Sequence, residues 1–121
     1  MIVELDIFSG LRNPSWELST DQTFEFIEKI SQNKIIQNLS ENSKPDLGYR
    51  GFIIEEKPND SQKTRKFTVY GKIIKVYENS SVYLVEDQEH GIERWLFQTA
   101  INKVDDDILN CALQEFENKI K

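Results

Sequence analysis

The chain has 121 residues, of which 38% are hydrophobic and 30% charged, a composition typical of one globular domain with a buried core. The net charge of −6 disfavours nucleic-acid binding, since contacts to phosphates need a basic surface. A single cysteine excludes an internal disulfide, and with only one histidine it disfavours a structural zinc site. We therefore expect one domain over residues 1–121, with no metal and no cofactor.

The sequence contains no apolar run of about eighteen residues, so we expect no membrane-spanning segment. Its first residues include Glu4 and Asp6, whereas a secretory signal begins with basic residues and an apolar block. These features predict a cytoplasmic protein that binds neither membranes nor nucleic acid.

The first half of the chain predicts one strand and one helix. Residues 2–8 alternate between apolar and polar side chains, as in a half-buried strand. Ser19 is expected to cap a helix that runs to about residue 33, with Gln22 completing a capping box. The helix should bury Phe24, Phe26, Ile27 and Ile30. Residues 35–39 are expected to pack as a helical turn.

Three strands are expected next. Residues 52–54 form an apolar strand, and 66–77 a longer one whose alternation shifts by one position. Such a shift beside a glycine predicts a β-bulge near residues 71–74. Asn79 suits the left-handed conformation of a tight turn. The strand at 82–85 is apolar on both faces and is therefore expected to lie centrally in the sheet.

The last third of the sequence is helical in pattern. Ile92, Leu96 and Thr99 belong to a clear amphipathic stripe, and Asp105 or Asp106 should cap a final helix. Cys111 lies beside the apolar stripe of that helix and is expected to be a small core residue rather than a nucleophile. The fold class is therefore α+β, with two layers: an antiparallel sheet of about four strands, covered by an N-terminal helix and a C-terminal antiparallel helix pair.

The segment 6–16 is the first candidate functional element. Arg12 offers five N–H donors, Asn13 can close a turn with its own side chain, and Trp16 supplies an apolar wall. Together these side chains would hold a carboxylate or phosphate near the start of the first helix. In the competing interpretation Trp16 fills the edge of the core, while Arg12 is solvated or pairs with an acid such as Asp6.

The second candidate element is Gly48–Phe52, where two glycines flank Tyr49 and Arg50. Such glycines indicate a sharp turn or a close approach of the backbone. The favoured interpretation is an ion pair between Arg50 and Asp6 on neighbouring strands. If Arg12 and Trp16 converge on Tyr49 and Arg50 instead, the result is an anion pocket with aromatic walls.

The third candidate is the run Glu86–His90, which contains three acids and the only histidine. Such a cluster can bind a divalent cation or act as acid and base. The favoured interpretation is structural, with Asp87 as the N-cap of the following helix and Glu89 near its positive end. We therefore assign no catalytic residue and no metal ligand from this run.

Two motifs carry a resemblance to a known group of proteins. The segment D-I-F-S-G-L-R-N-P-S-W at 6–16, followed by L-G-Y-R-G-F at 47–52, resembles a family of small uncharacterised bacterial and fungal proteins with D-I-F-S-G-R-P-N-P-x-W and L-G-Y-R-G-F. The chain departs from it in having Leu11-Arg12 where the family has Arg-Pro. The resemblance implies no activity, but it implies that the two motifs form one structural unit.

The sequence favours a non-catalytic binding or protein-interaction module. Its partner would be a small anionic ligand, a peptide or another protein, and Arg12, Asn13, Trp16, Tyr49 and Arg50 are the candidate ligand-binding residues. The alternative is a small enzyme acting on an anionic substrate. In that alternative Arg12 and Arg50 clamp the anion, Tyr49 or His90 is the acid, and Asp6 or Glu86 is the base, all within one cleft.

Overall fold

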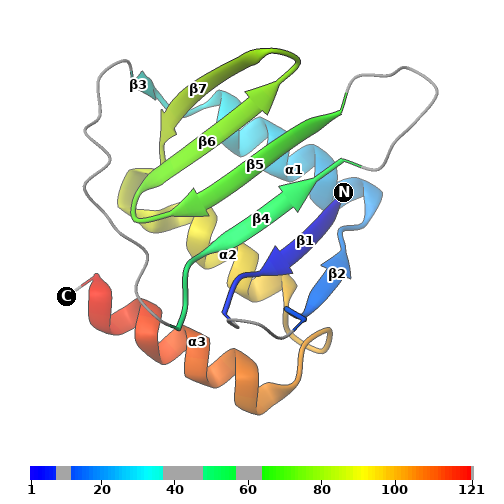
Figure 1. Cartoon of the computed structure of the whole chain (residues 1–121), viewed down its shortest axis with the longest axis vertical. Helices are drawn as coiled ribbons and strands as arrows, with labels where there is room; N and C mark the ends of the chain where they lie inside the picture. The colour runs from blue at the N-terminus through cyan, green and yellow to red at the C-terminus, as the bar shows by residue number, and fades with distance from the viewer. Residues whose placement is uncertain (8–11, 37–47, 57–63, 121) are drawn as a thin grey trace.

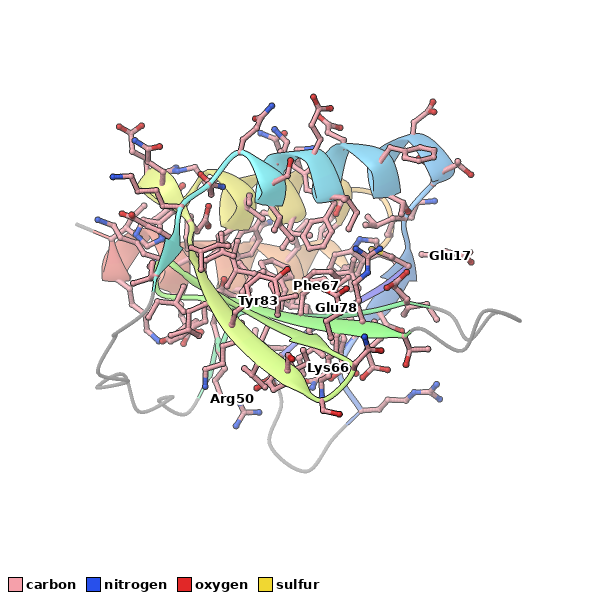
Figure 2. The ribbon with its side chains drawn as sticks, turned by 90° about the horizontal axis from the view of Figure 1, so that it is seen from above. Glu17, Arg50, Lys66, Phe67, Glu78 and Tyr83 are labelled. Carbon is pink, nitrogen blue, oxygen red and sulfur yellow. The ribbon has the colours of Figure 1, made fainter. Side chains whose placement is uncertain are left out.

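A computed structural model of the chain describes residues 1–7, 12–36, 48–56 and 64–120. These residues form two layers, an antiparallel sheet and helices that all cover the same face of it (Figures 1 and 2). The α+β class and the two-layer arrangement are thus as predicted. The elements, in chain order, are β1 (Ile2–Leu5), β2 (Ser15–Glu17), α1 (Thr20–Ser31), β3 (Ile35–Ile36), β4 (Phe52–Glu55), β5 (Arg65–Tyr70), β6 (Ile73–Glu78), β7 (Ser81–Glu86), the short turn η1 (Gln88–His90), α2 (Gly91–Thr99) and α3 (Asp106–Lys119).

The prediction of about four strands is an undercount, because the sheet has seven strands in the order β2-β1-β4-β5-β6-β7-β3. Two of the additional strands are very short edge strands. β2 pairs with β1, and β3, where a helical turn was expected, pairs with β7 through only two residues. Short edge strands limit pairing with other chains. The predicted central strand, here β7, consequently lies next to an edge, and its Val82 is 58% exposed.

The third additional strand comes from dividing the predicted strand at 66–77. The chain reverses at Gly71 and Lys72, whose φ angles of 62° and 71° are both positive. Tyr70 pairs directly with Ile73, so β5 and β6 form a hairpin with a two-residue turn. Two positive φ angles are what such turns require. The shift in the apolar–polar alternation therefore reflects a hairpin turn, and the prediction of a β-bulge is wrong.

The predicted helix caps are present. Ser19 and Gln22 form the capping box of α1, and the Asp105 side chain accepts from the backbone amides of Asp107 and Ile108 at the start of α3. α1 ends at Ser31, two residues earlier than expected. Its Phe24 is 71% exposed, because it lies two positions from the buried Phe26 and so on another side of the helix.

The core lies between the sheet and the helices. α3 runs back from the end of α2 in roughly the opposite direction and covers one end of the sheet (Figure 1). In Figure 2, Phe67 points toward the helices, whereas Arg50 lies on the side of the sheet that faces away from them. Cys111 of α3 is exposed, so the prediction of a core cysteine is wrong; Ala112, next to it, is the buried residue of this turn.

Candidate functional site

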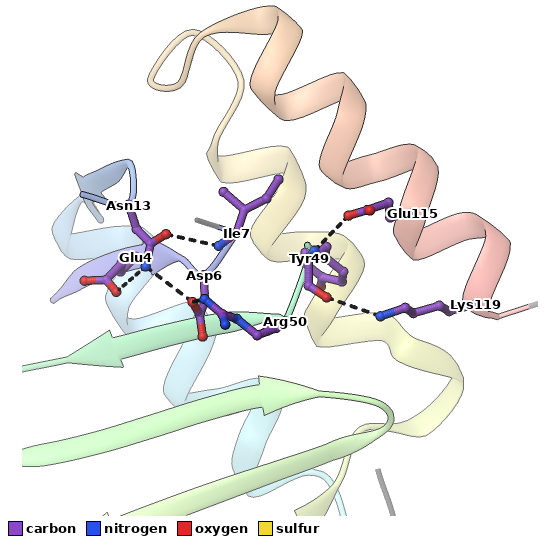
Figure 3. Close-up of polar contacts among 8 residues, drawn as sticks. All are labelled: Glu4, Asp6, Ile7, Asn13, Tyr49, Arg50, Glu115 and Lys119. Atoms are coloured by element: carbon purple, nitrogen blue, oxygen red, sulfur yellow. Dashed lines mark hydrogen bonds and ion pairs between the residues drawn. The ribbon is translucent and has the colours of Figure 1, made fainter. Parts of the chain in front are cut away.

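The segment that follows β1 is a hairpin connection between β1 and β2. Its Asn13 is the central polar residue: the side-chain oxygen accepts from the amide of Ile7 at 3.1 Å, and the side-chain nitrogen donates to Glu4 and Asp6 at 3.0 and 3.3 Å (Figure 3). The Asn13 side chain therefore joins the start of β2 to β1 and the residues that follow it, through bonds that span six to nine positions rather than a local turn. Arg12, next to it, is exposed. Residues 8–11 of the first motif lie outside the described residues.

Trp16 belongs to the core. It is 6% exposed, packs edge-on against Phe52, and donates its indole N–H to the hydroxyl of Thr99 in α2 at 3.0 Å. A buried indole needs such a partner, because an unpaired N–H away from water costs stability. Trp16 therefore joins the sheet to α2 and presents no surface to the side where Arg50 lies.

Arg50 pairs with Asp6, as the sequence predicted. The Nη2–Oδ1 distance is 2.9 Å, and the backbone continues the β1–β4 pairing, with the amide of Arg50 donating to the Asp6 carbonyl at 2.8 Å (Figure 3). The two side chains are 25% and 24% exposed, so solvent screens the pair, and we assign it about 1 kcal/mol or less. Together with Asn13 it fastens the two motifs to each other.

Gly48 and Gly51 place Tyr49 on the opposite side of this segment from Arg50. Both glycines have positive φ angles, 108° and 90°, which other residues rarely adopt. At Gly51 an added Cβ would lie 2.1 Å from the carbonyl oxygen of Val69, and at Gly48 one would lie 2.7 Å from Glu115. The two glycines thus allow the Tyr49 side chain to enter the core while Arg50 remains outside.

The last turns of α3 hold the Tyr49 backbone. Its amide donates to the carboxylate of Glu115 at 2.7 Å, and its carbonyl accepts from the ammonium of Lys119 at 3.2 Å (Figure 3). Glu115 and Lys119 are four residues apart and therefore lie on one side of the helix. Lys119 also donates to the hydroxyl of Tyr70 at 2.6 Å, so it connects α3 to the end of β5.

Inside the molecule, the side chain of Tyr49 reaches a buried glutamate. Its hydroxyl donates to Glu93 of α2, and the other carboxylate oxygen of Glu93 lies 3.1 Å from Nδ1 of His90. Glu93 is 1% exposed, whereas glutamate is almost never fully buried unless it is paired. Tyr49, Glu93 and His90 thus form one connected cluster, which we call the Tyr–Glu–His cluster.

The segment that carries His90 is held in an unusual conformation. Glu89 and His90 both have left-handed backbones, with φ angles of 56° and 57°. Asp87, itself 1% exposed, accepts from the amides of Ile92 and Glu93 at 2.8 and 3.0 Å. Its side chain thus binds the first amides of α2 as predicted, but the N-cap residue of α2 is His90 and not Asp87. Consecutive left-handed residues other than glycine cost free energy and persist where the surroundings enforce them.

A cavity of about 150 Å³ lies beside the Tyr–Glu–His cluster. Its walls come from four distant parts of the chain: Tyr49 before β4, the end of β5, the start of α2 and the last turn of α3. The wall residues include Tyr70, His90, Glu93, Phe116, Lys119 and Ile120. The aromatic and aliphatic groups make most of the wall apolar, with a few polar groups among them, as in small-ligand sites.

Burial shapes the electrostatics of the cluster. It is the largest cause of a raised pKa for Glu93, and the hydrogen bonds from Tyr49 and His90 act in the opposite direction. The pKa of the Tyr49 hydroxyl is also raised far above its usual range, first by burial and then by the charge of Glu93, so Tyr49 stays a proton donor. Burial raises the pKa of Asp87 as well, against the lowering effect of its two backbone hydrogen bonds.

The five predicted ligand-binding residues do not share one concave surface among the described residues. Arg12 is exposed, Asn13 and Arg50 have partners within the two motifs, and Trp16 is in the core. Tyr49 alone lines the cavity described above. The enzyme cleft expected from the sequence is likewise not assembled, because Asp6 pairs with Arg50 on the side away from Tyr49.

Sequence reasoning missed Glu93, Tyr70 and Lys119. The sequence did contain a signal for Glu93. It lies four positions before Phe97 and seven before Ala100, which are both buried, so the helical spacing places this acid on the same buried face as they are. Its partner Tyr49 is 44 residues away in the sequence, and no local pattern predicts that pairing.

The fold and the site therefore define an α+β domain with a buried Tyr–Glu–His cluster at the wall of a small cavity. No family model, curated protein or solved structure matched the chain. Among the described helices none is long and apolar enough to cross a membrane. No group of three potential metal ligands occurs within residues 1–7, 12–36, 48–56 and 64–120.

Proposed function

We propose that this protein is a non-catalytic binding module, and that it holds a small ligand, or a small terminal group of a larger partner, in the cavity beside His90. The observation that carries the proposal is Glu93, a buried acid joined to His90 and Tyr49 at the cavity wall. Burying a carboxylate without need is costly. Here the buried carboxylate fixes the ring of His90 at the wall of a small, mostly apolar cavity.

The size of the cavity limits the ligand. An apolar protein cavity of about 150 Å³ accommodates a molecule the size of benzene. We therefore expect ligands of about six to ten non-hydrogen atoms, or an equivalent side chain of a partner. The walls are apolar on the side of Phe116 and Ile120 and polar on the side of His90 and Lys119, which favours an amphipathic ligand.

One observation favours an enzyme as the second candidate. The pair formed by Glu93 and His90 is the arrangement in which a carboxylate orients an imidazole as a general base. The cavity walls of the described residues contain no serine, cysteine or threonine to act as the nucleophile. Binding without chemical turnover of the bound compound therefore separates the proposed function from this alternative.

The proposed function is tested by nuclear magnetic resonance with a set of small compounds of both charges. Because the chain contains one histidine, the ring signals of His90 are unambiguous. We expect at least one compound to shift them together with the amide of Gly71. The blocking variant Ile120→Trp should lose this effect, whereas Asn118→Trp, an exposed position of the same helix, should keep it.

Two outcomes would overturn the proposal. One is that no compound shifts the His90 ring. The other is that shifts of equal size persist in a folded Ile120→Trp protein, which would place the binding elsewhere. Recovery of chemically changed compound after incubation would favour the enzyme alternative.

A further inference from the structure

We infer that the ligand of this cavity is an anion, specifically a carboxylate on a small apolar body, recognised by Tyr70 and His90 beside the charge of Lys119. This inference rests on the proposed function and adds the chemical class of the ligand. It also moves the anion site predicted from the sequence, from the arginines of the two motifs to the side of the segment 48–52 that Tyr49 faces, beside the Tyr70 end of β5.

Tyr70 supplies the first donor. Its hydroxyl oxygen accepts from the ammonium of Lys119 at 2.6 Å, so the hydroxyl hydrogen is not used in that contact. A hydroxyl has one donor and two acceptor sites and can rotate to use them. The donor of Tyr70, polarised by the adjacent ammonium, is therefore available to an acceptor in the cavity.

His90 supplies the second donor. Its Nδ1 is engaged by Glu93, which leaves Nε2 for the cavity that His90 lines. With Nδ1–H donated to Glu93, Nε2 carries a hydrogen only in the imidazolium form. The carboxylate of Glu93 orients the ring through Nδ1, as the aspartate does in a catalytic triad. An anion bound at Nε2 is thus expected to bind together with a proton.

The charges around His90 decide between an anion and a cation. Lys119 lines the cavity and lies 5.0 Å from the centre of the Tyr70 ring, so the Tyr70 wall already carries a cation. A second cation would meet a like charge there, whereas an anion would be attracted. The titratable groups that share the cavity wall with His90 are Glu93, Tyr49, Tyr70 and Lys119, and Asp87 lies in the segment that carries His90.

The test uses three compounds that share one ring and differ in charge: benzoate, benzamide and benzamidine. We expect benzoate to shift the His90 ring signals and to bind about tenfold more tightly than benzamide, as a charge-assisted pair of hydrogen bonds implies. Benzamidine should bind least.

Two variants separate recognition from a merely structural role. Lys119→Met and Tyr70→Phe should each weaken benzoate by about tenfold, the effect of losing one charge-assisted contact, and weaken the neutral benzamide distinctly less. Equal losses for both compounds would mean that these residues only shape the cavity, and would overturn the inference. A short peptide ending in phenylalanine, compared with its amidated form, distinguishes a partner's terminal carboxylate from a free acid.

The remaining outcomes separate the inference from the proposed function. If benzamide or benzamidine shifts the His90 ring with an affinity equal to that of benzoate, the cavity binds ligands but does not select anions. In that case the inference is wrong and the proposed function stands. If none of the compounds, of any charge, shifts the ring, both fail.

Discussion

Gly51 and Glu93 show how single residues set this site. Gly51 lets the backbone of β4 approach that of β5 and turns the Tyr49 side chain inward. Glu93 then receives the Tyr49 hydroxyl and orients the His90 ring. One residue therefore acts through the shape of the backbone and the other through a buried charge, and each effect can be measured separately.

Gly51→Ala should destabilise the protein by about 3 kcal/mol or more, because the φ angle of 90° is strained for alanine and the added Cβ would lie 2.1 Å from the Val69 carbonyl oxygen. Urea unfolding measures this change. Gly91→Ala is the matched control, since nothing lies within 4 Å of its added Cβ and its φ is helical. We expect the control to change stability by about 1 kcal/mol at most. Similar stabilities for the two variants would contradict the role given to Gly51.

Glu93→Gln should change how stability depends on pH. Folding raises the pKa of Glu93 above its ordinary value of 4.5, so the carboxyl group stabilises the fold below that value and loses this contribution as the pH rises through the folded pKa. The glutamine amide does not titrate. The variant should therefore gain stability relative to the wild type as the pH increases above the ordinary range of glutamate.

Urea unfolding of both proteins at a series of pH values tests this expectation. Asp87 has a raised pKa in both proteins, so its effect largely cancels in the difference. Glu89→Gln, at an exposed position, controls for the loss of one negative charge. A stability difference that stays constant or declines with pH would mean that Glu93 is not buried as described.

At the scale of elements, the hairpin of β5 and β6 brings Tyr70 to the cavity. Its turn consists of Gly71 and Lys72, which both have positive φ angles. The Lys72 carbonyl accepts from the amide of Asp87 at 2.7 Å, so the turn is also attached to the segment that carries His90. The position of one short turn thus sets the relation between two walls of the site.

Lys72→Gly should stabilise the protein by about 0.5–1 kcal/mol, because glycine adopts the positive φ angle of 71° without strain. The backbone carbonyl that binds Asp87 is retained. Thermal or urea unfolding measures the gain. Lys66→Gly, within β5, is the comparison and should destabilise the protein, since glycine weakens a strand. A loss of stability in Lys72→Gly would contradict the two-residue turn.

The sequence predicted elements whose signals are local. The side chains of Ser19, Asp87 and Asp105 bind helix amides only two to six residues away. The ion pair of Asp6 with Arg50 was predicted because opposite charges follow one expected strand and precede another. The short strands β2 and β3 could not be predicted, because three and two residues show no periodicity. The hairpin at residues 70–73 was missed because Gly71 and Lys72 are not a common turn pair.

The candidate site was harder to predict, and the reason is the length of chain between its parts. Glu93 and Tyr49 are 44 residues apart, and Lys119 and Tyr70 are 49 apart. Such contacts depend on how α2 and α3 pack on the sheet, which no local pattern specifies. The described residues of the motifs that did stand out in the sequence, at 6–16 and 48–52, mainly fasten β1, β2 and β4 to one another.

At the scale of the whole molecule, the cavity exists because three segments meet at one end of the sheet. The β5–β6 turn, the start of α2 and the last turn of α3 each contribute a polar group, and Lys119 and Glu115 attach α3 to the Tyr49 backbone. A ligand in this cavity contacts all three segments. Binding should therefore stabilise the fold as a whole, by an amount that increases with ligand concentration.

The central claim is that this cavity holds a ligand at His90, and a crystal structure of the protein with benzoate tests it most directly. We predict the ring against Phe116 and Ile120, with the carboxylate within hydrogen-bond distance of the Tyr70 hydroxyl and of His90 Nε2. Glu93 should remain bonded to Tyr49 and to His90 Nδ1. A structure with benzoate bound elsewhere, or with Glu93 turned out to solvent, would contradict the account.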